Sequence, residues 1–490
     1  MLQVTLINHD FKYEVAELIK LFTTQFEFVD EKNFAKVLEN RLLTHNNNLI
    51  TTARYYENYS VRFEEKDSIN IEGLSEQEIK KLTKEMIKRT MFKVLRRIFN
   101  TYVPWGILTG IRPVKIVHTL LDNNVSDEDI RHNLKTNYLI SDEKIDLALE
   151  IAKRERVFVY PIDKNKISLY VSIPFCPTRC YYCSFPANPM DKFGKLREEY
   201  TDKLIEEIKG VSKLIKEANK EIETLYIGGG TPTTLEPEQL DRLIIALNKE
   251  LDLSNIKEFT VEAGRPDSIT RQKLEVMKKH NVSRISINPQ TMNDETLVKI
   301  GRNHSVAEII ECFNMARSMG FDNINMDIIL GLVDEDIEMV RNTLEEIKKL
   351  SPESLTVHTL AVKRASNLKE NIHEYELTQY EEMIEMIDLS MQYTKEMGLN
   401  PYYMYRQKHM LGNLENIGYA KQGYECIYNI QIMEEKQSNY AVGAGSISKF
   451  VYVDEDRIER VDNVKNVEQY IDRYEEMIER KKKEIYKNVN

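Results

Sequence analysis

The sequence predicts an α/β protein with a complete or partial (β/α) barrel at its centre. From about residue 166, short β-rich runs alternate with amphipathic helical runs, and repeated strand–helix units of this kind build parallel sheets. The 490 residues exceed what one hydrophobic core usually holds, so two or three domains are expected. Hydrophobic residues make up 42% of the chain, which is enough for sizeable cores and too much for a disordered protein.

The first region, residues 1–155, is expected to be an accessory α+β domain. The stretch 49–72 alternates like the strands of a half-exposed sheet. Ser75 and Glu78 then form an S-x-x-E capping box, which predicts the start of a helix with one apolar stripe. The pattern contains no constellation of ligand residues here, so a packing role is the simplest interpretation.

The barrel is expected over residues 160–400. Its strands are predicted at 167–173, 223–228, 257–262, 283–287, 323–329 and 354–359. Its helices are predicted near 195–219, 237–251, 270–280, 294–300, 305–319, 336–349 and 376–397. In such barrels the chemistry takes place at the carboxyl ends of the strands.

Residues 401–490 are expected to form an irregular C-terminal extension. Aromatic and basic residues interleave there without a regular period up to about residue 460. The segment 465–488 then predicts a charged helix, and its charge run is most simply a solvated face.

Composition and charge exclude several classes of function. The formal net charge is −11, which disfavours binding along a nucleic-acid backbone because such binding requires a basic face. The N-terminus has no apolar run before a cleavage-type site. No stretch approaches the roughly 18 uncharged apolar residues of a membrane span. These observations predict a cytoplasmic protein without nucleic-acid or membrane partners.

Three of the five cysteines, Cys176, Cys180 and Cys183, follow the first predicted barrel strand as C-x3-C-x2-C. In a reducing cytosol this crowding indicates metal ligation rather than disulfides. Three thiolates on one loop hold three irons of a four-iron cluster and leave the fourth iron open to a small chelating molecule. The alternative is structural zinc, which usually takes four protein ligands in paired spacings. Cys312 and Cys426 stand alone and provide no second pair.

A glycine-rich turn, YIGGGTPTTL, ends the next predicted strand with Gly228, Gly229, Gly230 and Thr231. Consecutive glycines let the backbone approach a ligand and turn its polar groups toward it. An ordinary tight turn is the alternative. The position one strand–helix unit after the cysteines favours a role in binding the same cofactor.

With these two motifs the chain resembles the radical S-adenosylmethionine superfamily. The segments TVEAGRPDSI, SRISINPQTMND, IGRNHS and NINMDIILGL resemble the oxygen-independent coproporphyrinogen III oxidase family. LTVHTLAVKRAS, YRQK, GNLENIGYA and GAGSISK resemble its HemZ-type branch. The resemblance spans about residues 90–460. It implies a partial (β/α)6-type barrel, one 4Fe-4S cluster and two bound molecules of S-adenosylmethionine.

The resemblance also assigns roles to individual residues. Cys176, Cys180 and Cys183 match the cluster ligands. The positions that match the first cofactor's site are Tyr170, the glycine turn with Gly228 and Gly229, and Glu262. The positions that match the second cofactor's site are Tyr182, Gly230, Thr231, Gln290, Arg302 and Asp327.

Four of these polar residues, Glu262, Gln290, Arg302 and Asp327, are the candidates for catalytic roles. Each has a simpler interpretation. Glu262 and Asp327 end predicted strands and could cap the following helices. Gln290 could be a core hydrogen-bonding residue, and Arg302 a surface residue. Their joint placement at strand ends favours a site.

The activity that the resemblance implies is the oxidative decarboxylation of coproporphyrinogen III to protoporphyrinogen IX without oxygen, in anaerobic haem biosynthesis. A 5′-deoxyadenosyl radical takes hydrogen from a propionate side chain, and an electron donor such as a flavodoxin or ferredoxin is required. The tetrapyrrole's carboxylates call for cations. We expect Lys363, Arg364, Arg406 and Lys408 to supply them, although ordinary surface cations are an equal alternative.

One departure from the family bears on the reaction. The well-characterised oxidases carry a fourth cysteine two positions after the third, whereas this chain reads Cys183-Ser184-Phe185. The missing cysteine is not a cluster ligand in the superfamily pattern. Relatives that keep both motifs include haem chaperones and radical methyltransferases that open haem, so these stand as alternative functions. A non-enzymatic zinc protein is a third.

Overall fold

The computed structural model describes residues 1–30, 36–110, 112–184, 188–361, 380–406 and 414–487. The chain divides into two compact units, Met1–Glu150 and Ile151–Asn490. Among the described residues, no helix combines the length and the apolar character that a membrane crossing requires.

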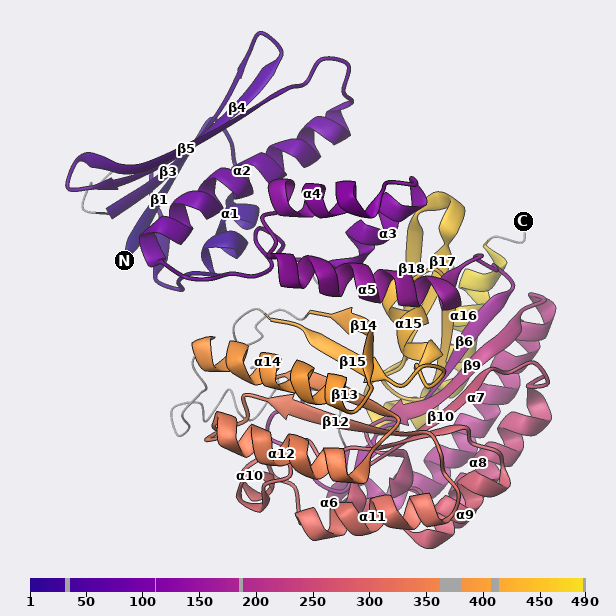
Figure 1. Cartoon of the computed structure of the whole chain (residues 1–490). Helices are drawn as coiled ribbons and strands as arrows, with labels where there is room; N and C mark the ends of the chain where they lie inside the picture. The colour runs from indigo at the N-terminus through magenta and orange to yellow at the C-terminus, as the bar shows by residue number, and fades with distance from the viewer. Residues whose placement is uncertain (31–35, 111, 185–187, 362–379, 407–413, 488–490) are drawn as a thin grey trace. The chain divides into compact units, whose positions relative to one another are not determined.

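The N-terminal unit is an α+β structure built on one mixed sheet (Figure 1). The sheet order is β2 (Phe26–Phe28), β1 (Leu2–Ile7), β3 (Lys36–His45), β4 (Asn48–Glu57) and β5 (Ser60–Asn70). The helices are α1 (Lys12–Ile19), α2 (Glu76–Phe99), α3 (Val114–Asp122), α4 (Asp127–Asn137) and α5 (Asp142–Val159), the last of which spans the division. The strands expected within 49–72 are confirmed as β4 and β5.

Helix α2 begins where the capping box placed it. The Ser75 side chain accepts a hydrogen bond from the Glu78 backbone N–H, and the Glu78 carboxylate accepts one from the Ser75 backbone N–H at 2.8 Å. The buried stripe of α2 includes Ile87, Met91 and Leu95, and it packs on β4 and β5. The cap fixes the start of α2, and hydrophobic burial against the sheet stabilises the rest of the helix.

The second unit is built on a sheet whose core strands are parallel, as expected for a partial (β/α)6-type barrel. These parallel strands are β6 (Lys166–Ile173), β9 (Glu221–Gly229), β10 (Glu258–Gly264), β11 (Arg284–Ile287), β12 (Ile324–Leu330) and β13 (Ser354–Thr359). Each coincides with a predicted strand to within about two residues. Two short strands, β7 (Phe175–Cys176) and β8 (Asn188–Pro189), pair separately.

The helices of this unit follow the strands in the predicted alternation. They are α6 (Met190–Phe193), α7 (Arg197–Glu217), α8 (Pro237–Glu250), α9 (Arg271–Lys279), α10 (Asp294–Lys299), α11 (Val306–Ser318), α12 (Ile337–Leu350) and α14 (Tyr380–Glu396). Figure 1 shows α7, α8, α9, α11 and α12 along one face of the sheet, and neighbouring helices in this series contact one another. The candidate functional site lies at the carboxyl ends of the parallel strands.

The C-terminal segment is more regular than we expected. Its elements are β14 (Asn400–Tyr405), β15 (Asn416–Ala420), α15 (Ile427–Glu434), β16 (Ser438–Val442), β17 (Ile447–Tyr452), β18 (Arg457–Asp462) and α16 (Val467–Tyr486). β15 pairs antiparallel with β13 at one end of the barrel sheet, and β16 pairs parallel with β6 at the other. Aromatic and basic residues interleave in this segment without a regular period, which is why the pattern looked irregular.

The charge run of α16 is not only a solvated face, as we had interpreted it. Lys481 is fully buried and donates to Glu207 of α7 at 2.8 Å and to Asn463 at 2.7 Å. Glu207 also accepts from the Gly443 N–H at 2.7 Å and from the Tyr470 hydroxyl at 2.6 Å. The helical period alone could not separate this lysine from its exposed neighbours, because its partner lies 274 residues away in sequence.

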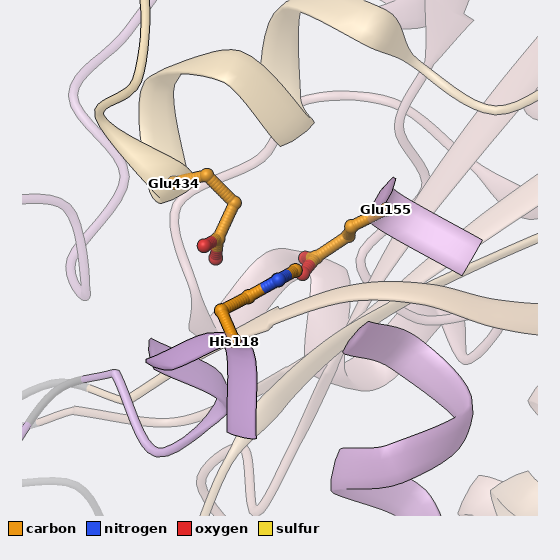
Figure 2. Close-up of side chains that lie close together, drawn as sticks. All are labelled: His118, Glu155 and Glu434. Atoms are coloured by element: carbon orange, nitrogen blue, oxygen red, sulfur yellow. The ribbon is translucent and has the colours of Figure 1, made fainter. Parts of the chain in front are cut away.

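A second buried carboxyl lies between α5 and α15. Figure 2 shows Glu155 and Glu434 directed toward one another. Burial raises the pKa of Glu155 well above its ordinary value, and the neighbouring Glu434 carboxyl adds to the rise. Glu155 therefore keeps its proton at a pH where an exposed glutamate has lost it.

Replacing the buried lysine should destabilise the barrel unit. Lys481→Ala leaves the Glu207 carboxylate buried without its cation, and the expected cost is about 3–5 kcal/mol of unfolding free energy. The measurement is denaturant unfolding followed by circular dichroism. Lys482→Ala is the matched control, because Lys482 is 46% exposed. Equal stabilities of the two variants would contradict the structural role of the buried pair.

Candidate functional site

The three clustered cysteines lie on the loop that follows β6. The Cys183 backbone N–H donates to the Cys180 carbonyl at 3.1 Å, which closes a turn between them. The Thr231 hydroxyl lies 3.9 Å from the Cys176 sulfur. The cysteine loop and the glycine turn at the end of β9 are therefore in direct contact.

Backbone hydrogen bonds fix that contact. The Gly230 N–H donates to the Ile173 carbonyl at 2.7 Å, and the Thr231 N–H donates to the Phe175 carbonyl at 2.7 Å. A Cβ on Gly230 would lie 2.5 Å from the Phe175 carbonyl oxygen and 2.9 Å from the Cys176 sulfur. Gly229 has a φ of +113°, which side chains rarely adopt. The glycines are thus required by close approach and by backbone conformation.

A cavity of about 250 Å³ opens beside this contact, at the carboxyl ends of the parallel strands. Ten of the predicted site residues line it: Cys176, Cys180, Tyr182, Cys183, Gly229, Gly230, Thr231, Glu262, Gln290 and Arg302. Residues separated by up to 126 positions in sequence are brought together as the strand-end rule predicts.

The remaining predicted residues are placed differently. Tyr170, Gly228 and Asp327 lie behind the cavity wall rather than on it. Arg406 is 3% exposed and does not line the cavity, so it is not an ordinary surface cation either. Lys363, Arg364 and Lys408 lie outside the described residues.

Glu262 is held by a group of tyrosines. The Tyr226 hydroxyl donates to the Glu262 carboxylate at 2.9 Å, and Tyr226 stacks on Tyr170 and Tyr428 with ring centroids 5.9 Å and 4.5 Å away. Burial, together with the negative charge of Asp327, raises the pKa of Glu262 to about 7. The aromatic packing sets the position of Glu262, and its carboxyl group gains or loses a proton near neutral pH.

Asp327 belongs to a polar chain that reaches the cavity through His358. Asn325 donates to one Asp327 oxygen at 2.7 Å, and His358 Nε2 lies 3.8 Å from the other. His358 Nδ1 lies 3.3 Å from the Tyr405 hydroxyl. Burial acts to raise the pKa of Asp327, but the hydrogen bonds and the charge of His358 outweigh it and hold that pKa below its ordinary value.

Gln290 has a backbone conformation that is unusual for its residue type. Its φ is +69°, in the left-handed region. Strand β12 holds it there, because the Gln290 N–H donates to the Asp327 carbonyl and the Ile329 N–H donates to the Gln290 carbonyl, both at 2.9 Å. Strained residues cluster at functional sites, which supports a binding role for this side chain.

Arg302 is a buried cation of the cavity wall. Its guanidinium donates to the Asn288 carbonyl at 2.6 Å and to the Tyr182 hydroxyl at 3.2 Å. Its Nε has no hydrogen-bond partner among the described residues. The side chain thus retains a buried donor for an anionic group in the cavity.

Several lining residues were missed in the sequence. They are Thr178, Arg265 and Asn288. Arg265 stands three residues after Glu262, and this proximity to a strand end was the signal that could have identified it. Tyr405, which directly precedes the predicted substrate residue Arg406, also lines the cavity. His358, near the end of β13, also lines the cavity.

The thiols fit an iron–sulfur cluster better than zinc. Three of them face one cavity, whereas Cys312 donates to the Pro266 carbonyl and Cys426 lies against Glu258, both away from it. Zinc in a structural site needs a fourth ligand that these cysteines do not provide. Burial raises the pKa of the Cys176 thiol to about 12, so cationic iron is needed to hold it as a thiolate.

Comparison with known proteins defines the class. A sequence model of the Radical SAM superfamily matches residues 170–347. The solved structure of the coproporphyrinogen III oxidase HemN from Escherichia coli, described as a radical SAM enzyme, superposes with a TM-score of 0.52 at 23% identity, covering 67% of this chain and 73% of HemN. Residues 170–347 therefore form a radical SAM domain, a class that implies a 4Fe-4S cluster and S-adenosylmethionine.

Within this class the sequence defines a narrower group. The chain is 45% identical over 381 residues to the oxygen-independent coproporphyrinogen-III oxidase-like protein HemZ of Bacillus subtilis (strain 168), covering 77% of this chain and 76% of HemZ. The heme chaperone HemW of the same organism is 31% identical, over 57% of this chain and 70% of HemW. This protein belongs to the HemZ-like family of radical SAM proteins.

Gly230→Ala should prevent stable assembly of the cluster. The added methyl group would overlap the Phe175 carbonyl and crowd the Cys176 sulfur, so the cysteine loop must move. After anaerobic reconstitution we expect a loss of more than half of the bound iron and sulfide relative to the wild type. Gly110→Ala is the matched control, since a Cβ there meets nothing within 4 Å. Full iron content in Gly230→Ala would contradict the proposed contact.

The stability of the cofactor-free protein should depend on pH through Glu262. The folded state keeps this proton up to pH of about 7, whereas an ordinary glutamate loses it near pH 4.5. Between these values the folded state binds more protons than the unfolded state, so the unfolding free energy falls as pH rises.

Two variants test this assignment by denaturant unfolding across that pH range. Glu262→Gln should lose the decline, because its side chain stays neutral. Tyr226→Phe removes a hydrogen bond that favours the charged carboxylate, so the decline should extend to higher pH. An identical pH dependence in the wild type and Glu262→Gln would show that another group is responsible.

Proposed function

We propose that this protein catalyses the oxygen-independent oxidative decarboxylation of coproporphyrinogen III to protoporphyrinogen IX, in the cytoplasm and as a step of anaerobic haem biosynthesis. The observation that carries the proposal is the convergence of three thiols, a glycine turn and strand-end polar residues on one cavity in a chain with 45% identity to HemZ. HemZ is described as a coproporphyrinogen-III oxidase-like protein, which supports the choice of substrate.

The residues of the chain would bind and orient the reactants. Cys176, Cys180 and Cys183 would hold the cluster, and the Gly229–Gly230 turn would present its backbone to S-adenosylmethionine. When bound, the cluster and S-adenosylmethionine would supply the radical chemistry that removes hydrogen from the substrate. The protein contributes position and exclusion of water, and the buried tyrosines behind Glu262 suit that task.

A second molecule of S-adenosylmethionine is part of the proposal. Tyr182 and Arg302, which the family pattern places at a second cofactor, are hydrogen-bonded to each other at 3.2 Å. Gln290 is held nearby by β12. The free Nε of Arg302 suits a carboxylate, a group that every molecule of S-adenosylmethionine carries.

The propionates of the substrate require cations near the cavity. Binding by Lys363, Arg364, Arg406 and Lys408 stays a prediction. The flavodoxin or ferredoxin that would donate electrons also stays a prediction.

A haem chaperone is the second candidate, because the chain is 31% identical to HemW over more than half of its length. A chaperone would bind haem and leave its propionates intact. The two functions therefore differ in a product that can be measured.

The decisive experiment supplies anaerobically reconstituted protein with coproporphyrinogen III, S-adenosylmethionine and dithionite. We expect 5′-deoxyadenosine, CO2 and protoporphyrinogen IX. Cys183→Ser should abolish all three products, whereas Cys312→Ser should retain them, because Cys312 lies away from the cavity. Cleavage of S-adenosylmethionine without CO2 would overturn the decarboxylase proposal and leave the radical SAM class intact. Stable haem binding in that case would favour the chaperone.

A further inference from the structure

Arg265 is a buried cation beside the cysteine loop to which the proposed reaction assigns no chemical step. It follows β10 and is 4% exposed. Its guanidinium makes hydrogen bonds on three sides, to Asp267, to Thr178 and to the sulfur of Cys180. Burial of a charged arginine has a large desolvation cost, which these hydrogen bonds offset.

Asp267 and Thr178 fix the orientation of the guanidinium. Arg265 donates to the two oxygens of Asp267 at 3.0 Å and 2.5 Å, a bidentate pair. It also donates to the Thr178 carbonyl at 3.1 Å and to the Thr178 hydroxyl at 2.9 Å. The Thr178 hydroxyl in turn donates to the Gly301 carbonyl at 2.9 Å. The guanidinium group of Arg265 therefore has little freedom to rotate away from the cysteine loop.

The nitrogen that donates to Thr178 also reaches a cluster ligand. Nη1 of Arg265 lies 3.6 Å from the Cys180 sulfur, within hydrogen-bond distance for sulfur. Hydrogen bonds to the ligand sulfurs and nearby charge are two of the factors that set the reduction potential of an iron–sulfur cluster. Both stabilise the reduced cluster, because reduction adds negative charge.

We propose that Arg265 is a positioning residue that raises the reduction potential of the cluster, through a fixed N–H donor and positive charge at the Cys180 sulfur. Asp267 and Thr178 hold it in that orientation. The inference rests on the radical SAM class and is independent of the tetrapyrrole substrate. Its consequence is that the cluster accepts an electron from a weaker reductant than it otherwise would.

The test compares reduction potentials of anaerobically reconstituted proteins without S-adenosylmethionine. Arg265→Gln removes the positive charge and the bidentate guanidinium donors. At a fixed solution potential the ratio of reduced to oxidised cluster should fall about tenfold, which corresponds to a shift of about 59 mV to more negative potential. The measurement is a redox titration followed by electron paramagnetic resonance, with iron content determined for every sample.

Two further variants make the result interpretable. Arg265→Lys keeps the charge but loses the bidentate guanidinium donors, so a smaller shift in the same direction is expected, and this variant decides the question if Arg265→Gln does not assemble its cluster. Arg271→Gln, an exposed arginine at the start of α9, should keep the wild-type potential. An unchanged potential in the cluster-containing Arg265 variants would overturn the proposal. Weaker S-adenosylmethionine binding without a change in potential would overturn it as well, because that result assigns Arg265 to the cofactor.

Discussion

The contact between the cysteine loop and the glycine turn is the constraint on which the rest of the site depends. Two backbone hydrogen bonds join the end of β9 to the residues before and at the start of the loop, from Gly230 to Ile173 and from Thr231 to Phe175. No side chain fits between them at Gly230. The start of the cysteine loop is therefore fixed to the glycine turn by main-chain geometry, and the cavity opens where the parallel strands end.

Around this contact the cavity combines both signs of charge. Arg265 and Arg302 stand close to the thiols, while Glu262 faces the same space with its pKa raised to about 7. Each charge is held by neighbours rather than by solvent: Asp267 for Arg265, and Tyr226 for Glu262. A cavity arranged in this way suits a zwitterionic ligand, whose amino and carboxylate groups need opposite partners.

Much of the fold and part of the site could be predicted from the sequence. The physical reason is different for the strands and for the residues of the site. The barrel strands were found because each is a short apolar run followed by an amphipathic helix, as β12 and α12 illustrate. The residues lining the cavity were found because the strand-end rule groups them. The rule also brought in Asp327, which lies behind the wall, since it does not say which way a side chain points. The buried environment of Lys481 could not be predicted, because its partner Glu207 lies 274 residues away in sequence.

The pairing of β16 with β6 has a consequence for the integrity of the whole unit. β6 carries the cysteine loop at its end, and in a barrel of only six strands it would be an exposed edge with unpaired backbone groups, open to pairing with another chain. β16 occupies that edge, and β17 and β18 extend the sheet beyond it in antiparallel pairs. β16, β17 and β18 thus cover the open edge of the strand that carries the cysteine loop. A shortened protein that kept every cofactor residue would lose that protection.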